Sequence, residues 1–183
     1  MENIQNLQVR ELELSDIELL ADYWLLSDPA FMQGMGVDLT KLPLREDLVT
    51  MLKSQLDYSI EKKQSYALIW ELDGKQIGHT NVNQIMFGEQ AYMHLHLWNS
   101  TFRQKGAGAI LVQKSLPYFF ENLKLKTLYC EPYTLNPAPN KTLEKIGFEF
   151  VKTHVTIPGT LNFEQEVHLW KLTRKNYLLK INA

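Results

Sequence analysis

Residues 98–116 read WNSTFRQKGAGAILVQKSL, and this stretch decides the fold because it joins an alternating strand to an amphipathic helix. Gly106 and Gly108 stand where the helix begins and allow close approach of the main chain. The unpaired N–H groups of a first helical turn converge there at the positive end of the helix dipole and form an anion site. Arg103 and Lys105 add charge at its rim, which suits a pyrophosphate. An ordinary strand-to-helix turn with a capping glycine is the alternative interpretation of the loop alone.

Two other phosphate-binding loops can be compared with these residues. A Walker loop requires G-x-x-x-x-G-K-[ST], and the sequence contains no such string. A dinucleotide fingerprint would need glycine or alanine where Leu111 stands, although Glu131 lies near the place of its ribose-binding acid. The antiparallel strands expected before the loop also argue against a dinucleotide fold, which opens with parallel βαβ units. A dinucleotide enzyme is therefore the least favoured alternative.

Turn residues and hydrophobic periodicity divide the rest of the chain into further elements. The Asp73-Gly74 pair predicts a hairpin, Gly147 closes a helix, and Pro117 is expected to kink another. The expected strands cover residues 9–14, 66–72, 75–87, 91–98, 127–130, 148–157 and 164–172. The expected helices cover residues 16–27, 45–62, 106–122 and 137–146, with a long loop at 28–43. This order predicts a mixed α/β fold in one domain that covers residues 1–183.

Length and composition describe an ordinary globular domain. The chain has 183 residues, of which 45% are hydrophobic and 22% charged, with a formal net charge of -2. This balance gives no global attraction to nucleic acid or anionic lipid. The N-terminus is polar and acidic, and no apolar run reaches the roughly 18 residues of a membrane span. We therefore expect a cytoplasmic protein without nucleic-acid or membrane partners, in which the single cysteine, Cys130, is an inert core residue.

Two motifs, which agree in order and spacing, resemble those of a known family. Residues 103–108 (RQKGAG) fit the R/Q-x-x-G-x-G/A pyrophosphate loop of GNAT superfamily acyltransferases, and residues 136–148 (NPAPNKTLEKIGF) resemble the family's N-x-x-x-x-x-x-L-E-K-x-G-F segment. The L-E-K-x-G-F ending is most similar to the branch of ribosomal-protein N-terminal acetyltransferases. The resemblance implies the GNAT fold, a mixed and mostly antiparallel sheet of about six to seven strands with about four helices. Such a sheet is splayed between the strands at 91–98 and 127–130, where acyl-CoA lies.

The resemblance also implies an activity and a cofactor site. A protein of this family transfers an acetyl group from acetyl-CoA, its co-substrate, to a primary amine of a protein N-terminus or of a small molecule. The main chain at Leu97 and Trp98 would bind the pantetheine arm, and Asn136 would hydrogen-bond to it or help close the site. The pyrophosphate cradle would consist of Arg103, Gln104, Lys105, Gly106, Ala107, Gly108 and Ala109. Direct transfer needs no metal, and the final pair of strands allows a homodimer.

The candidate base lies on the strand that precedes the loop. Alternation places His94 and His96 on one face of this strand. Relatives commonly carry a glutamate here, where this chain has Tyr92 or Met93. His96, or His94 through a water molecule, is therefore the candidate base, because imidazole titrates near neutral pH. The alternative for each is a structural histidine bonded to a neighbouring strand, and His79 is a weaker candidate of the same kind.

The usual acids of the family are missing. Many relatives have a tyrosine where Leu143 stands, and the ribosomal-protein branch often has a serine where Pro139 stands. Tyr133 is the candidate acid, or else an aromatic contact to the cofactor. Residues 28–43 and 158–163 fall where relatives build the wall of the acceptor site. Because the usual acid and base are absent, a non-catalytic acyl-CoA-binding sensor is the alternative function.

Overall fold

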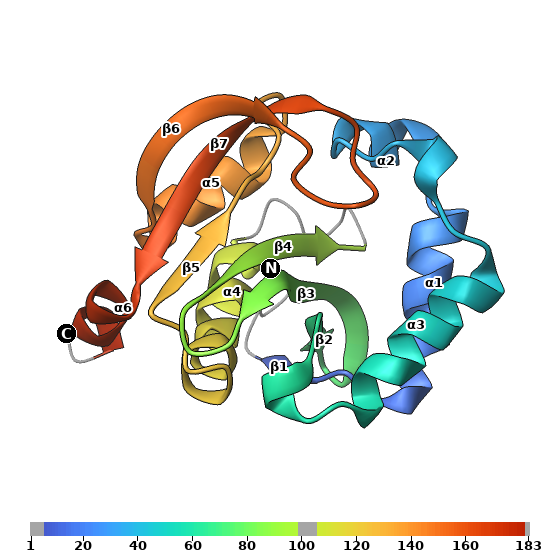
Figure 1. Cartoon of the computed structure of the whole chain (residues 1–183), viewed down its shortest axis with the longest axis horizontal. Coiled ribbons are helices and arrows are strands. Elements are labelled where there is room, and N and C mark those ends of the chain that lie inside the picture. The colour runs from blue at the N-terminus through green and yellow to red at the C-terminus, as the bar shows by residue number, and fades with distance from the viewer. Residues whose placement is uncertain (1–5, 99–105, 182–183) are drawn as a thin grey trace.

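The computed structural model describes residues 6–98 and 106–181, which form a single seven-stranded sheet with helices on both faces (Figure 1). The strand order is β1-β2-β3-β4-β5-β7-β6, and every neighbouring pair is antiparallel except β4 and β5. The strands are β1 (Leu7–Glu11), β2 (Tyr66–Leu72), β3 (Lys75–Met86), β4 (Gln90–Leu97), β5 (Thr127–Cys130), β6 (Glu149–Thr156) and β7 (Gln165–Thr173).

Helices cover both faces of this sheet. The α-helices are α1 (Ile17–Leu26), α2 (Pro29–Gly34), α3 (Arg45–Asp57), α4 (Ala107–Pro117), α5 (Pro137–Ile146) and α6 (Arg174–Ile181). Short turns of other helical type are η1 (Leu14–Asp16), η2 (Leu39–Lys41), η3 (Ile60–Lys62) and the π-helical η5 (Tyr118–Asn122). In Figure 1, α1 and α3 lie together on one side of the molecule, and α5 and α6 lie on the other. No helix among the described residues is long and apolar enough to cross a membrane.

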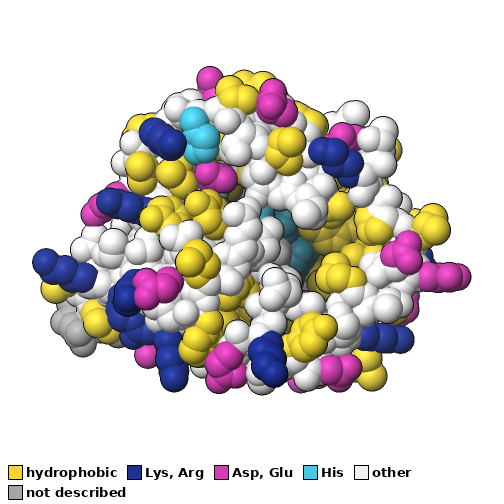
Figure 2. Space-filling model, viewed as in Figure 1, with side chains coloured by type: hydrophobic (Ala, Val, Ile, Leu, Met, Phe, Trp, Pro, Cys, Tyr) yellow, Lys and Arg dark blue, Asp and Glu magenta, His cyan; other side chains and the backbone are white. Residues whose placement is uncertain are grey.

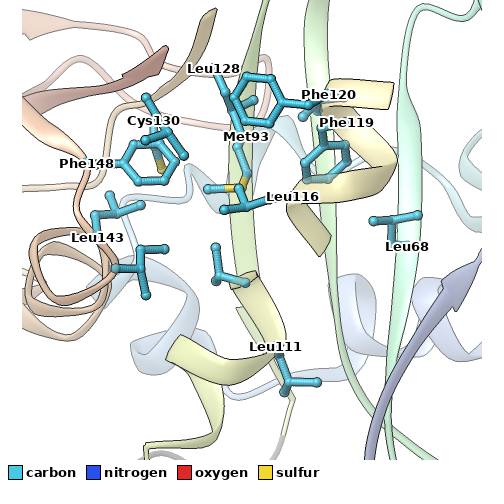
Figure 3. Close-up of a cluster of buried hydrophobic side chains, with 14 of the residues drawn as sticks. Leu68, Met93, Leu111, Leu116, Phe119, Phe120, Leu128, Cys130, Leu143 and Phe148 are labelled. Atoms are coloured by element: carbon cyan, nitrogen blue, oxygen red, sulfur yellow. The ribbon is translucent and has the colours of Figure 1, made fainter. Parts of the chain in front are cut away.

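The main core lies between the sheet and α4, as Figure 3 shows. Leu111 and Leu116 on the inner face of α4 are buried against Leu68 and Met93 of the sheet. Full burial of a side chain of this size stabilises the fold by roughly 1.5–3 kcal/mol. The buried indole of Trp70 also donates a hydrogen bond to the Ser115 hydroxyl at 2.9 Å, so this polar pair adds no unsatisfied group to the core.

The opposite face of the sheet is apolar at one end and polar at the other. A small cluster of Leu12, Leu20 and Ile69 packs there beneath α1 and α3. On β3 and β4 the same face instead carries histidine and asparagine side chains, among them His79 and His96. The apolar end therefore packs against α1, and the polar end presents side chains that can bind a ligand or transfer a proton.

The first strand lies two to three residues earlier than its alternation predicts, since it spans Leu7–Glu11 rather than residues 9–14. The carboxylate of Asp16 accepts a hydrogen bond from the main-chain N–H of Glu13 at 2.9 Å. It also accepts two hydrogen bonds from the guanidinium of Arg10, at 2.6 and 2.8 Å. This buried carboxylate ends the strand before Leu14 and starts the helical turn that leads into α1.

Two short helices do not appear among the predicted elements. The segment predicted as a loop at 28–43 contains α2, because Asp28 caps it through a 2.8 Å hydrogen bond from the N–H of Phe31. The helix α6 follows β7 at the end of the described residues. These residues therefore contain six α-helices rather than the expected four or so. Pro117 does mark a change of helical type, from α4 to the π-helical turn η5.

The sheet opens between β4 and β5. These parallel strands pair from Gln90 and Thr127 to Met93 and Cys130. There β5 ends, whereas β4 continues to Leu97. The predicted splay is therefore present, and it starts directly after Met93. Burial raises the pKa of the Cys130 thiol, which fits an inert residue at this point.

Candidate active site

A cavity of about 400 Å³ lies beside this opening, on the face of the sheet that α1 and α3 cover. Figure 2 shows it as a hollow with histidine side chains at its floor and hydrophobic side chains along one wall. That wall comes from α1 and α3 and consists of Leu20, Trp24, Leu48, Met51 and Leu52. The far side comes from residues that follow β5 and from the β6–β7 loop, namely Glu131, Pro132, Tyr133, Asn136, Pro139, Pro158, Gly159, Thr160, Leu161 and Asn162.

Strand register assembles the floor of the cavity. On the paired strands β3 and β4, His79 lies opposite His96, and Asn81 lies opposite His94. Alternate residues of a strand point to the same face, so these four side chains share one side of the sheet. The predicted common face of His94 and His96 is therefore present. The place of His79 beside them depends on register, which the sequence does not reveal.

Aromatic residues hold two of these histidines. The indole N–H of Trp98 donates to Nδ1 of His79 at 2.7 Å, and the Tyr23 hydroxyl lies 3.0 Å from Nδ1 of His96. Since an indole only donates, Nδ1 of His79 is an acceptor and its proton is on Nε2. Burial lowers the pKa of His79 to about 3 and that of His96 well below its usual value. Both rings are therefore neutral and oriented at neutral pH.

His94 differs from the other two. Its Nε2 is buried and has no hydrogen-bond partner among the described residues. Burial lowers its pKa to about 4, so it too is neutral at neutral pH. A Cβ on Gly159 would lie 3.6 Å from Cε1 of His94, so the β6–β7 loop packs next to this ring. A buried ring nitrogen without a partner is suited to bind a polar ligand atom.

The opposite wall carries the polar residues that follow β5. The Tyr133 ring meets Phe163 edge to face with centroids 5.7 Å apart, and the main-chain N–H of Asn136 donates to the Tyr133 carbonyl at 3.0 Å. Glu131 lies 3.1 Å from Nε2 of His154. Burial raises the pKa of the Glu131 carboxyl group, and His154 opposes the shift. Sequence reasoning considered Glu131 only as a ribose-binding acid, although its place directly after a buried strand indicates a site at the sheet edge.

The start of α4 is the place where the sequence predicts an anion site. Gly106 adopts a left-handed conformation with φ of 77°, and a Cβ at this position would meet none of the described residues within 4 Å. A Cβ on Gly108 would lie 3.8 Å from Leu97 and 3.9 Å from Thr142, so α4 begins between β4 and α5. Ala107 and Ala109 are buried. The other three predicted members of the cradle, Arg103, Gln104 and Lys105, lie outside the described residues.

The main chain of β4 alternates in direction along the opening. The N–H of Trp98 donates to the Ile77 carbonyl at 2.9 Å, and the His94 carbonyl accepts a hydrogen bond from the Thr80 hydroxyl at 2.7 Å. Both groups therefore face β3. Because successive residues of an antiparallel strand face opposite neighbours, the main chain of Leu97 faces the opening.

Hydrogen bonds between two distant loops close the outer side of the cavity. The Gly36 carbonyl accepts hydrogen bonds from the side-chain amides of Asn162, at 2.8 Å, and Gln165, at 3.0 Å. The N–H of Asp38 also donates to the Leu161 carbonyl at 2.8 Å. The segments expected to form the acceptor wall thus lie against each other. Within the described part of the chain, no histidine, cysteine and carboxylate side chains group in a way that could hold a metal ion.

Comparison with known proteins gives concordant results. A family model described as an acetyltransferase (GNAT) domain matches residues 6–149. The fold is similar to spermidine N-acetyltransferase from Vibrio cholerae in complex with CoA and spermine, with a TM-score of 0.77 and 17% identity over 94% of this chain and 98% of that one. It is also similar to RimL, a ribosomal L7/L12 alpha-N-protein acetyltransferase in complex with CoA, with a TM-score of 0.76 and 14% identity over 94% of this chain and 96% of that one. No curated protein sequence matches the chain.

Proposed function

The chain belongs to the GNAT acetyltransferase family, and on that premise we propose that it transfers the acetyl group of acetyl-CoA to a primary amine held in the cavity. The observation that carries this proposal is the position of the sheet opening. It lies between the start of α4, which suits a pyrophosphate, and a cavity lined by His94, whose buried Nε2 has no hydrogen-bond partner among the described residues. A cofactor bound along β4 would present its thioester next to that nitrogen.

The residues around the opening fit acetyl-CoA. The open space at Gly106 and the N–H groups of residues 106–109 would hold the pyrophosphate, and Arg103, Gln104 and Lys105 are proposed to add to this cradle. The main chain of Leu97 faces the opening and is proposed to bind the pantetheine arm, and the N–H of Trp98 donates to the Ile77 carbonyl of β3. When bound, acetyl-CoA supplies an activated acetyl group, and Asn136 lines the route to it.

We assign the proton transfers to His94 and Tyr133. The amine nitrogen forms a bond to the thioester carbonyl carbon, and the C–S bond breaks. The neutral His94 accepts a hydrogen bond from the nitrogen and takes its proton as the C–N bond gives that nitrogen positive charge. Tyr133 lines the opposite wall, and its hydroxyl would supply a proton to the departing sulfur. His96 is held by Tyr23 and would keep His94 and its surroundings in place.

Calorimetric binding of acetyl-CoA tests the cofactor site. Gly106→Glu places an anion in the proposed cradle and should abolish binding. Gly74→Glu is the matched control, because Gly74 also has a positive φ, 75°, and open space around it, but lies in the β2–β3 turn. Equal binding by both variants and the wild type would contradict the proposed cradle.

Acetyl transfer to a panel of amines separates the enzyme from the alternative sensor. A protein that binds acetyl-CoA and acetylates at least one amine is an N-acetyltransferase. A protein that binds acetyl-CoA tightly but transfers nothing to any amine would favour the sensor.

The surroundings of the enzyme are also part of the proposal. We propose one domain over residues 1–183, which works in the cytoplasm without nucleic-acid or membrane partners. The net charge of -2 supports the expected lack of nucleic-acid and membrane partners, since it provides no attraction to polyanions.

The edge strand β6 exposes Phe150 and Val155, which supports a homodimer formed along this edge. Light scattering coupled to size exclusion tests the dimer.

A further inference from the structure

The cavity contains very little charge. Apolar side chains of α1 and α3 form one complete wall, and no lysine or arginine among the described residues lines any part of it. Glu131 is the one carboxylate among the described residues that line the cavity. A ligand that enters this space therefore leaves water for a mostly apolar surface.

The polar floor adds no charge at neutral pH. Burial keeps His79, His94 and His96 neutral, and Asn81 and Asn83 are uncharged amides. These groups donate and accept hydrogen bonds, but they do not compensate a positive charge. The floor can therefore bind an amine nitrogen through neutral acceptors, but it offers no negative charge to a second ammonium group further along a ligand.

The carboxylates around the cavity already have partners. On α1, Glu18 and Asp22 lie 2.8 and 2.5 Å from the guanidinium of Arg45. The Glu131 side chain is only 10% exposed and lies 3.1 Å from Nε2 of His154, and burial raises the pKa of its carboxyl group. The one described carboxylate that lines the cavity is thus already in contact with a ring nitrogen, and its burial disfavours the charged form that an additional ammonium group would need.

We propose that the acceptor carries one primary amine next to an apolar alkyl or aryl group, and that diamines and polyamines are poor acceptors. This inference rests on the proposed function and specifies its substrate class. The amine would approach Nε2 of His94, and the apolar group would lie against Trp24 and Leu52. The Vibrio cholerae enzyme with the similar fold is a spermidine N-acetyltransferase crystallised with spermine, so the two proteins would differ in acceptor. Two sources share the proposed chemistry, a small monoamine and a peptide whose first residue is apolar.

The test compares acceptors of equal length that differ in one charge. Initial rates with acetyl-CoA give kcat/KM for hexylamine and for 1,6-diaminohexane, and we expect hexylamine to be better by at least about tenfold. Spermidine should be as poor as the diamine. Assays with 2-phenylethylamine and with a short peptide that begins with phenylalanine then distinguish the two sources of the amine.

A carboxylate placed in the apolar wall of the cavity should shift the acceptor preference toward the diamine. Met51 lines the cavity at its rim and is 45% exposed, so Met51→Glu can be accommodated and would offer a carboxylate to a second ammonium group. The ratio of kcat/KM for diamine to that for hexylamine should rise in this variant. Thr50→Glu is the control, because Thr50 is the exposed neighbour on α3 and does not line the cavity.

The possible results separate a failure of the proposed acceptor class from a failure of the proposed function. Wild-type rates with spermidine or the diamine that equal those with hexylamine would overturn the inference and leave the acetyltransferase in place. An unchanged ratio in a folded Met51→Glu would likewise contradict the role of wall charge. Acetyl-CoA binding without transfer to any of these amines would overturn the proposed function and the inference with it.

Discussion

The imidazole rings of His79 and His96 stack face to face, with centroids 4.5 Å apart and planes 13° from parallel. They are directly opposed on β3 and β4. Burial is the main cause that lowers the pKa of both rings, and repulsion from a charge on His79 lowers that of His96 further. The two rings therefore form an uncharged stacked pair, and the Nε2 of the nearby His94 has no hydrogen-bond partner among the described residues.

The free energy of unfolding should fall as the pH drops below the range in which exposed histidines bind a proton. Burial lowers the pKa of His79 to about 3 and that of His94 to about 4, whereas an exposed histidine has a pKa near 6.5. The histidines of the unfolded chain thus bind protons near pH 6.5, and those of the folded chain do not. The contribution of these neutral histidines to stability is complete above their pKa in the unfolded chain, and it is lost as the pH falls toward 4. Each such histidine removes up to about 1.4 kcal/mol of unfolding free energy per pH unit.

Urea denaturation between about pH 7 and pH 5 measures this loss. His94→Gln removes one of the groups, so its unfolding free energy should depend less steeply on pH than that of the wild type. His168→Gln is the control, because His168 lies on β7 outside the cavity and contacts the Thr153 hydroxyl. An unfolding free energy that stays constant over this range would contradict neutral burial of the cluster.

Close packing of β3 against β4 depends on Gly78. A Cβ at this position would collide with the main-chain oxygen of His96 and lie 3.1 Å from the Trp70 ring. Gly78→Ala should therefore lower the unfolding free energy by about 1–3 kcal/mol, because the strands beneath the cavity must separate. Gly34→Ala on α2 is the matched control, since its Cβ would meet nothing within 4 Å. It should raise the stability by up to about 1 kcal/mol. Equal stability of the two variants would contradict this account.

Loss of His94 should affect chemistry more than cofactor binding. His94→Gln removes the proposed proton acceptor and should lower kcat by roughly 10²–10⁴-fold. Acetyl-CoA binding measured by calorimetry should not change, because the cradle lies at the start of α4. His168→Gln should retain wild-type kcat. If His96→Gln loses more activity than His94→Gln, the proton acceptor is His96, the candidate that the sequence also offered.

Local patterns predicted much of the fold. The strands β2 and β5 and the helix α5 have the predicted bounds, because the hairpin pair Asp73-Gly74, a short buried run and the capping Gly147 are each encoded within a few neighbouring residues. The two helices that were not predicted, α2 and α6, are short, at six and eight residues. Helices of this length take their stability from packing rather than from their own sequence, so periodicity is a weak guide to them.

The sequence by itself determined the order of the seven strands and of four helices, the glycine-rich start of α4 and the common face of His94 and His96, since each depends on residues close together in the chain. Only the tertiary structure decided that His79 joins them, because this depends on the register of two strands. It also decided that Tyr23 reaches His96 from 73 residues away, and that Nε2 of His94 is left without a partner. Periodicity places a side chain on a face, but the packing of distant segments decides what that face meets.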